Sequence, residues 1–295
     1  MNRTRRGVLY VTAVVIVAAP PVLWFVMHLS ATPSEAVIVP VSYARGATSV
    51  VAGSASAATS STGSLVALAE RDPLALARIG HERYEREIDD YRCVLIKQES
   101  ICGTLTAVEE VELRFRKAPH TVYMLWRKNA SQAKRALFKE DDPDFINDEG
   151  QPIARVEPAG AVVRIFVKDI MIPVNGEQAR KVSRRTIDEC GFGATFDLLQ
   201  RFNGIARQKG VLDVRYAGIA EVDGRPTYVI VRHLPYEGEG GAYPDAKMVL
   251  HLDREWLLPV AVESFADADG TKLLGRYFFT QVEVNPGLTD QDFEF

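Results

Sequence analysis

The residues that could carry out chemistry are few and scattered along this sequence. His251 shares a face of a predicted strand with Asp253, which is part of what a hydrolase needs to activate a nucleophile. No Gly-x-Ser-x-Gly elbow supplies that nucleophile, and the sequence contains no P-loop, dinucleotide fingerprint or zinc motif. We therefore expect the strand histidines to face solvent, and we predict no catalytic residues, no metal and no cofactor.

Three cysteines occur, at positions 93, 102 and 190, and their spacing matches no metal motif. Cys93 and Cys102 flank a predicted turn, so one disulfide and one free thiol would fit an oxidising compartment. Three buried, unpaired thiols fit the sequence equally well.

Charged residues suggest one weak anion site and no nucleic-acid surface. Arg184 and Arg185 precede Gly191 at the start of a predicted helix, where amides and arginines together can hold a lipid phosphate. Gly191 also fits a helix start without any ligand.

We expect Glu99 to pair across strands with Lys97 or Arg116, as a structural contact. The net charge is −4 with no basic cluster, which excludes binding to nucleic acids.

Two amphipathic helices are predicted within the folded part of the chain. The first begins at Asp72-Pro73, because Asp is a good N-cap and Pro suits the first helical position. The second covers about Phe192 to Gln208, where apolar residues recur at three- and four-residue steps.

Alternating apolar and polar residues predict strands on both sides of the second helix. They occupy residues 92–99, 105–116 and 120–127 before it, and about five short strands follow within Val211 to Val284. Both faces of the 120–127 strand are apolar, so we expect both to be covered. This order predicts an α+β fold, with two helices against the concave face of a strongly curved antiparallel sheet.

The N-terminus predicts export. Basic residues precede an uncharged apolar run from Val8 to Leu29, which is long enough to span roughly 30 Å of hydrocarbon as a helix. The basic residues place the rest of the chain across the inner membrane. We expect residues 1–31 to form a single-pass inner-membrane anchor, with the C-terminal domain in the periplasm. Pro20-Pro21 interrupts the run, so a cleaved signal peptide and secretion to the periplasm is the alternative. Residues 32–71 are predicted to be a flexible linker to a domain over 72–295.

Several phrases resemble a bacterial envelope family known as domain of unknown function 1571. The opening ones are Tyr91-Arg-Cys-Val-Leu-Ile-Lys97-Gln-Glu99, then Gly103, then Arg116-Lys-Ala-Pro119-His-Thr-Val-Tyr123-Met-Leu-Trp126. The closing ones are Asp253-Arg-Glu-Trp-Leu-Leu-Pro-Val260 and Asn285-Pro-Gly-Leu-Thr-Asp-Gln-Asp-Phe293. The resemblance covers about residues 72–295. The Asp-x-x-x-Leu-Leu-Pro-Val phrase also looks like the Lol-type lipoprotein carriers and their periplasmic sensor relatives.

That resemblance implies a LolA-like open half-barrel, in which helices cover an apolar cavity that can hold acyl chains. Ten apolar side chains are candidates to line it: Phe115, Val122, Met124, Trp126, Phe196, Phe202, Met248, Leu250, Tyr277 and Phe279. The implied function is non-catalytic binding or sensing of a lipid or a lipoprotein acyl chain. The alternatives are a periplasmic scaffold with a filled core and a hydrolase without a recognisable motif.

Overall fold

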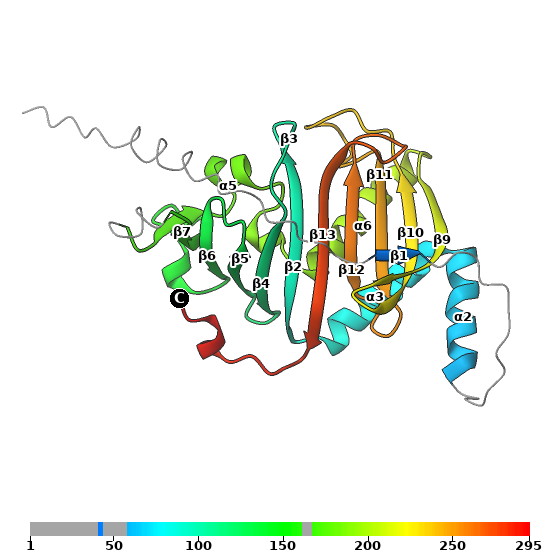
Figure 1. Ribbon diagram of the computed structural model, residues 1–295, viewed down its shortest axis with the longest axis horizontal. Coiled ribbons are helices and arrows are strands. Elements are labelled where there is room, and N and C mark those ends of the chain that lie inside the picture. The colour runs from blue at the N-terminus through cyan, green and yellow to red at the C-terminus, as the bar shows by residue number, and fades with distance from the viewer. Residues whose placement is uncertain (1–40, 44–57, 161–166) are drawn as a thin grey trace, which may run out of the picture.

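The computed structural model describes residues 41–43, 58–160 and 167–295, and its strands form one open antiparallel sheet (Figure 1). The sheet has 13 strands in the order β1-β9-β10-β11-β12-β13-β2-β4-β5-β6-β7-β8, with β3 paired to β2 outside this path. Every neighbouring pair is antiparallel. β1 and β8 are the two edges, so the described strands do not close into a barrel.

The elements have the following bounds. The strands are β1 (Val41–Tyr43), β2 (Asp90–Ile101), β3 (Thr104–Leu105), β4 (Glu109–Arg116), β5 (Thr121–Lys128), β6 (Ala133–Lys139), β7 (Ile153–Pro158), β8 (Ile170–Pro173), β9 (Asp213–Val222), β10 (Arg225–His233), β11 (Lys247–Asp253), β12 (Pro259–Phe265) and β13 (Leu273–Val284). The α-helices are α2 (Ala58–Arg71), α3 (Pro73–Glu87), α5 (Glu177–Val182) and α6 (Phe192–Gln208). Short 3₁₀ turns are η1 (Pro143–Phe145), η2 (Ile187–Glu189) and η3 (Asp290–Phe293).

The sheet bends around two helices. Buried side chains from β2, β4 and β5 and from β10 to β13 belong to one core cluster together with side chains of α3 and α6. A flat sheet of this width could not bring strands so far apart against the same two helices. Figure 1 shows α3 and α6 on one side of the strands. The prediction of an open antiparallel sheet covered by helices is therefore confirmed.

Both predicted helices form where their local signals indicate. The Asp72 carboxylate accepts the N–H of Ala75 at 3.2 Å, and Pro73 is the first residue of α3. The bounds of α6 agree with those expected from its apolar stripe, and Phe192, Phe196 and Leu199 on that stripe are buried.

Residues 58–71 are helical, although the sequence predicted a flexible linker there. α2 leads directly into α3, and the Asp72 N–H donates to the Leu68 carbonyl at 2.7 Å. Leu65 and Val66 pack against the main core cluster. Short helices gain most of their stability from tertiary packing, which composition alone does not reveal. The linker prediction is wrong for these residues, and the rest of that segment, β1 excepted, lies outside the described residues.

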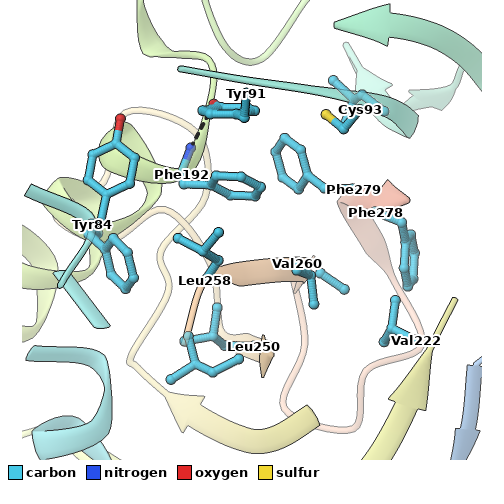
Figure 2. Close-up of a cluster of buried hydrophobic side chains, with 14 of the residues drawn as sticks. Tyr84, Tyr91, Cys93, Phe192, Val222, Leu250, Leu258, Val260, Phe278 and Phe279 are labelled. Atoms are coloured by element: carbon cyan, nitrogen blue, oxygen red, sulfur yellow. Dashed lines mark hydrogen bonds between the residues drawn. The ribbon is translucent and has the colours of Figure 1, made fainter. Parts of the chain in front are cut away.

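Aromatic side chains join the sheet to α6 at the centre of the core. Tyr91 stacks on Phe115 with ring centroids 4.8 Å apart, and its centroid lies 4.5 Å from that of Phe192. The Tyr91 hydroxyl accepts the Phe192 N–H at 3.2 Å, drawn as a dashed line in Figure 2. This bond satisfies an amide that the start of a helix leaves without an intrahelical partner, and it fixes α6 on β2.

The second apolar face of β5 is covered by the C-terminal segment. Tyr123 is buried in a separate cluster with Phe145 and Phe293, and Leu125 packs against it. The other face of β5 belongs to the main core. The expectation that both faces of this strand are covered is confirmed.

The turn between β11 and β12 carries the Asp-x-x-x-Leu-Leu-Pro phrase and supports α3. The Asp253 carboxylate accepts the N–H groups of Glu255 and Trp256 at 3.0 and 2.9 Å. Arg225 donates to the same carboxylate at 2.8 Å. These bonds hold the turn with Leu257 buried and at a φ of 58°.

The three cysteines are free thiols. Cys93 lies near the start of β2 and Cys102 follows its end, so most of a 12-residue strand separates them, roughly 30 Å of extended chain. A disulfide needs Cα atoms within about 7 Å. The prediction of a disulfide between Cys93 and Cys102 is therefore wrong. The alternative with three unpaired thiols agrees with the structure, except that Cys102 is exposed and not buried.

The predicted membrane anchor or signal peptide, residues 1–31, lies outside the described residues. Of the helices that the structure describes, none has the length and hydropathy needed to cross a membrane.

Gly80 allows close contact between α3 and the supporting turn. A Cβ at this position would lie 2.5 Å from the Leu257 carbonyl oxygen and 3.1 Å from the Phe196 ring. We expect Gly80→Ala to lower the free energy of unfolding by about 1–3 kcal/mol, measured by urea denaturation. Gly204→Ala is the matched control on α6, where a Cβ meets nothing within 4 Å, and it should stabilise by up to about 1 kcal/mol. Equal effects of the two variants would contradict the close packing.

His251 is fully buried, contrary to the expectation that strand histidines face solvent. It lies on an inner strand between buried Val229 and Ala261, and its Nδ1 is 3.2 Å from the Thr227 hydroxyl. Burial lowers the pKa of His251 to about 4.

This burial predicts a loss of stability in acid. Between pH 6.5 and 4 the unfolded chain binds a proton at His251 while the folded chain does not, so stability present above pH 6.5 is lost as the pH falls to 4. The loss is about 3 kcal/mol. We expect His251→Gln to reduce the change in unfolding free energy between pH 7 and pH 4 by about this amount. His233→Gln on β10, a half-buried position, is the control, and the same reduction in both variants would refute the assignment.

Candidate ligand-binding cavity

A cavity of about 1160 Å³ lies between the concave face of the sheet, α6 and the segment 173–191. Exposed residues on α5, among them Lys181 and Val182, also line it, so it opens to solvent beside that helix. Most of the wall is apolar. The apolar lining residues are Leu95, Met124, Trp126, Ala133, Ala136, Ala154, Val156, Pro158, Ile170, Ile172, Pro173, Val174, Ala179, Val182, Ile187, Leu198, Leu199, Phe202, Pro244, Met248, Val262, Tyr277 and Phe279.

The cavity continues the packed core along the strands. On the inward face of β2, Tyr91 and Cys93 belong to the core alone, and Leu95 belongs to the core and also lines the cavity. Lys97 and Glu99, farther along the same face, line the cavity. β5 shows the same division, with its first inward side chain in the core and the next two in the cavity wall. The helices therefore fill one end of the concave face and leave the other end hollow.

Six of the ten side chains selected from the sequence line the cavity: Met124, Trp126, Phe202, Met248, Tyr277 and Phe279. The other four, Phe115, Val122, Phe196 and Leu250, are buried in the main core cluster and are not among the lining residues. They lie on the expected elements but at the end that the helices fill. Contact of any of the ten with a ligand stays a prediction.

A buried ionic network forms the polar part of the wall. The Lys97 ammonium lies 3.1 Å from Glu99 and 3.2 Å from Glu109. Glu109 also accepts the Trp126 indole N–H at 3.0 Å and the Ser131 hydroxyl at 3.2 Å. The network thus joins β2, β4 and β5 at the hollow end of the sheet.

Glu99 connects this network to the segment that follows α5. It accepts the Tyr277 hydroxyl at 2.6 Å, the Ser183 hydroxyl at 3.0 Å and the Arg184 backbone N–H at 3.2 Å. The expected pairing of Glu99 with Lys97 is confirmed, and pairing with Arg116 is wrong because that side chain reaches Asp290 instead.

These contacts set the charge states. Burial by itself would lower the pKa of Lys97, but Glu109 and Glu99 outweigh it and raise that pKa above its ordinary value. Burial would raise the pKa of Glu99, but Lys97 and the hydrogen bond from Tyr277 hold it below the usual range. Burial and Glu99 both raise the pKa of Tyr277, so its hydroxyl stays protonated. At neutral pH Lys97 and Glu99 are therefore charged.

The position of this network in the wall of the cavity was not predicted from the sequence. Its signal was the two-residue alternation, because Lys97 and Glu99 have the same parity as Leu95 and therefore share its inward face. Lys and Glu are rarely buried, so residue type argued against that position.

Anion binding by Arg184 and Arg185 at the start of α6 stays a prediction, and the two side chains lie in different surroundings. Phe192 in the first turn is fully buried and its N–H is bound to Tyr91, which closes that helix start. Arg184 lies 3.8 Å from Glu239, whereas Arg185 lines the cavity.

The groups considered for catalysis do not come together. Asp253 is occupied by Arg225 and turn amides, and His251 contacts Thr227. Burial raises the pKa of the cavity-lining thiol of Cys190 to about 12, so it is protonated at neutral pH and a poor nucleophile.

We expect Lys97→Met to lower the free energy of unfolding by about 3 kcal/mol, because it leaves two buried carboxylates without their cation. The loss should shrink in acid, because Glu99, once Lys97 no longer holds its pKa down, can bind a proton in the folded variant. Lys181→Met is the control, since Lys181 also lines the cavity but forms an exposed pair with Glu177. Urea unfolding should show a change below about 1 kcal/mol for this variant. Similar losses in both variants would contradict a buried network.

Comparisons with solved structures show distant similarity. MucB is 16% identical, with 81% of this chain and 63% of that chain covered and a TM-score of 0.39. The Mycobacterium tuberculosis lipoprotein LppX is 12% identical, with 74% and 98% covered and a TM-score of 0.40. The LolA superfamily protein NE2245 from Nitrosomonas europaea is 9% identical, with 74% and 97% covered and a TM-score of 0.30. The chain therefore spans less than two thirds of MucB. No curated protein matches the chain.

A family model gives a more specific result. Residues 88–295 match the family described as "Protein of unknown function (DUF1571)". The match runs from the end of α3 to the last residue and includes every residue that lines the cavity. The resemblance noted in the opening and closing phrases is confirmed, and the chain belongs to the DUF1571 family.

Proposed function

We propose that this protein binds a lipophilic ligand, a lipid or the acyl chain of a lipoprotein, without transforming it. The observation that carries this proposal is the hollow end of the concave face, about 1160 Å³ and lined mainly by apolar side chains. Ligand pockets in proteins typically measure about 300–1,000 Å³, so an acyl chain fits this cavity. Water in contact with such a wall is unfavourable, and an apolar ligand would displace it.

The gain is large enough for useful affinity. Burying about ten methylene groups contributes on the order of 8 kcal/mol before the costs of association and of ordering the chain. The wall is already formed by paired strands, so little reorganisation of the protein is required.

The polar groups in the wall support binding rather than catalysis. Lys97 and Glu99 are occupied by each other and by neighbouring groups, and Arg232 is held by Asp245 at 2.9 Å. Groups saturated in this way are not available to attack a substrate or to move its protons. The scaffold alternative needs a filled interior, which the described residues do not have.

We also propose that the domain acts on the periplasmic side of the inner membrane. The basic residues followed by an apolar run in residues 1–31 support an anchor, with a cleaved signal peptide as the alternative. A domain in that position has envelope lipids and lipoproteins within reach.

We expect native mass spectrometry of the full chain, purified from its own envelope, to show co-purified lipid. The mass of the polypeptide will also show whether residues 1–31 are retained. An apo mass together with no uptake of a fluorescent acyl probe would refute lipid binding, whereas a shortened polypeptide would refute only the anchor.

Filling the cavity should abolish uptake of the probe. Ser264 is a half-buried lining residue on β12, so we expect Ser264→Trp to weaken binding of a fluorescent acyl probe at least about tenfold by occupying its space. Arg215 is an exposed residue of β9 that does not line the cavity. Arg215→Trp therefore adds the same side chain elsewhere and should leave the affinity unchanged. Equal affinities of the two variants would place the probe elsewhere.

A further inference from the structure

We propose that the ligand is an amphiphile with an anionic head group, and that Arg185 binds this head group while the acyl chain lies in the apolar part of the cavity. This inference rests on the proposed function and adds the chemical class of the ligand. The shared chemistry is a phosphate or carboxylate oxygen carried on an apolar chain.

The cations of the wall differ in whether they have a partner. Among the described residues, four cationic side chains line the cavity: Lys97, Lys181, Arg185 and Arg232. Lys97 is paired with Glu99 and Glu109, and Lys181 lies 2.7 Å from Glu177. Arg232 makes two hydrogen bonds to the Asp245 carboxylate at 2.9 and 3.0 Å. Each of these three cations is therefore paired with a carboxylate of the protein.

Arg185 is the exception. In the described part of the chain no carboxylate lies within 4.0 Å of its guanidinium, and no hydrogen bond engages it. Glu189 also lines the cavity and has no cationic partner among the described residues. Its carboxylate accepts the Thr186 N–H at 3.4 Å. Arg185 therefore presents its positive charge and its donors to the cavity.

The position of Arg185 suits a head group. It is half-buried on the segment that follows α5, close to the side on which the cavity opens to solvent. Tyr277 lies within its electrostatic influence, because Arg185 is one of the charges that lower the pKa of that hydroxyl against the larger effect of burial. An amphiphile would thus place its tail among apolar residues of the sheet and its charge near the entrance.

The local backbone holds Arg185 in place. The neighbouring Ser183 hydroxyl and Arg184 N–H both donate to buried Glu99, which fixes the chain just before it. A guanidinium on a fixed backbone can offer two parallel donors to a phosphate or carboxylate, and charge-assisted bonds of this kind are among the strongest in proteins.

The experiment compares two ligands that carry the same hexadecyl chain and differ in their head group. Hexadecyl phosphate and hexadecanol each displace a fluorescent acyl probe from the full chain at pH 8. We expect the wild-type protein to bind the phosphate about tenfold more tightly than the alcohol. Arg185→Gln should remove this preference and leave the affinity for hexadecanol unchanged, which also shows that the variant folds.

Arg184→Gln is the matched control, because it removes the same charge from the adjacent residue, which does not line the cavity. This variant should keep the preference for the phosphate. Equal affinity of the wild type for the two ligands, or equal losses in the two variants, would overturn the role of Arg185. Inorganic phosphate should not displace the probe, and displacement at a similar concentration would show a site for the free anion and overturn the amphiphile. If neither amphiphile displaces the probe, the proposed function fails as well.

Discussion

The cavity exists because the helices are too short for the surface that the strands create. α3 and α6 pack against one end of the concave face, where aromatic contacts such as that of Tyr91 with Phe192 belong to the main core cluster. The strands continue past this packed end, and their inward side chains line a space that no described helix occupies. Curvature keeps the two sides of the sheet apart, and paired strands cannot collapse without breaking their ladder hydrogen bonds. The hollow persists because the strands that form most of its wall are hydrogen-bonded to one another.

The ionic network provides partners for polar side chains at the hollow end. Without such a network, inward side chains there would be either apolar and exposed to water, or polar and without hydrogen-bond partners. Lys97, Glu99 and Glu109 instead satisfy one another, and Glu99 also fixes the segment after α5 across to β13 through Tyr277. Buried charges are expensive to desolvate, so this arrangement contributes position more than stability. It holds the rim of the cavity, and with it Arg185, in one geometry.

Much of the fold could be predicted because its signals are local. The N-cap at Asp72, the apolar stripe of α6 and the alternation along β2 depend on neighbours within a few residues, and each appears where it was expected. The failures share one cause. α2 has a composition typical of a linker and becomes helical by packing on the sheet, and His251 is buried by strands that are adjacent only in the folded state. The separation of Cys93 from Cys102 depended on one strand running without a turn.

By itself the sequence determined the two main helices, most of the strands, the inward parity of those strands and the family of the chain, because these depend on spacing along the chain. Only the tertiary structure decided which inward residues are core and which are cavity wall. Phe115 and Met124 are both inward apolar residues on neighbouring strands. Phe115 lies in the core beneath the helices, whereas Met124 also lines the cavity. That difference depends on where two helices end on a curved sheet. The tertiary structure also decided that Arg185 lines the cavity, while its chain neighbour Arg184 pairs with Glu239 outside it.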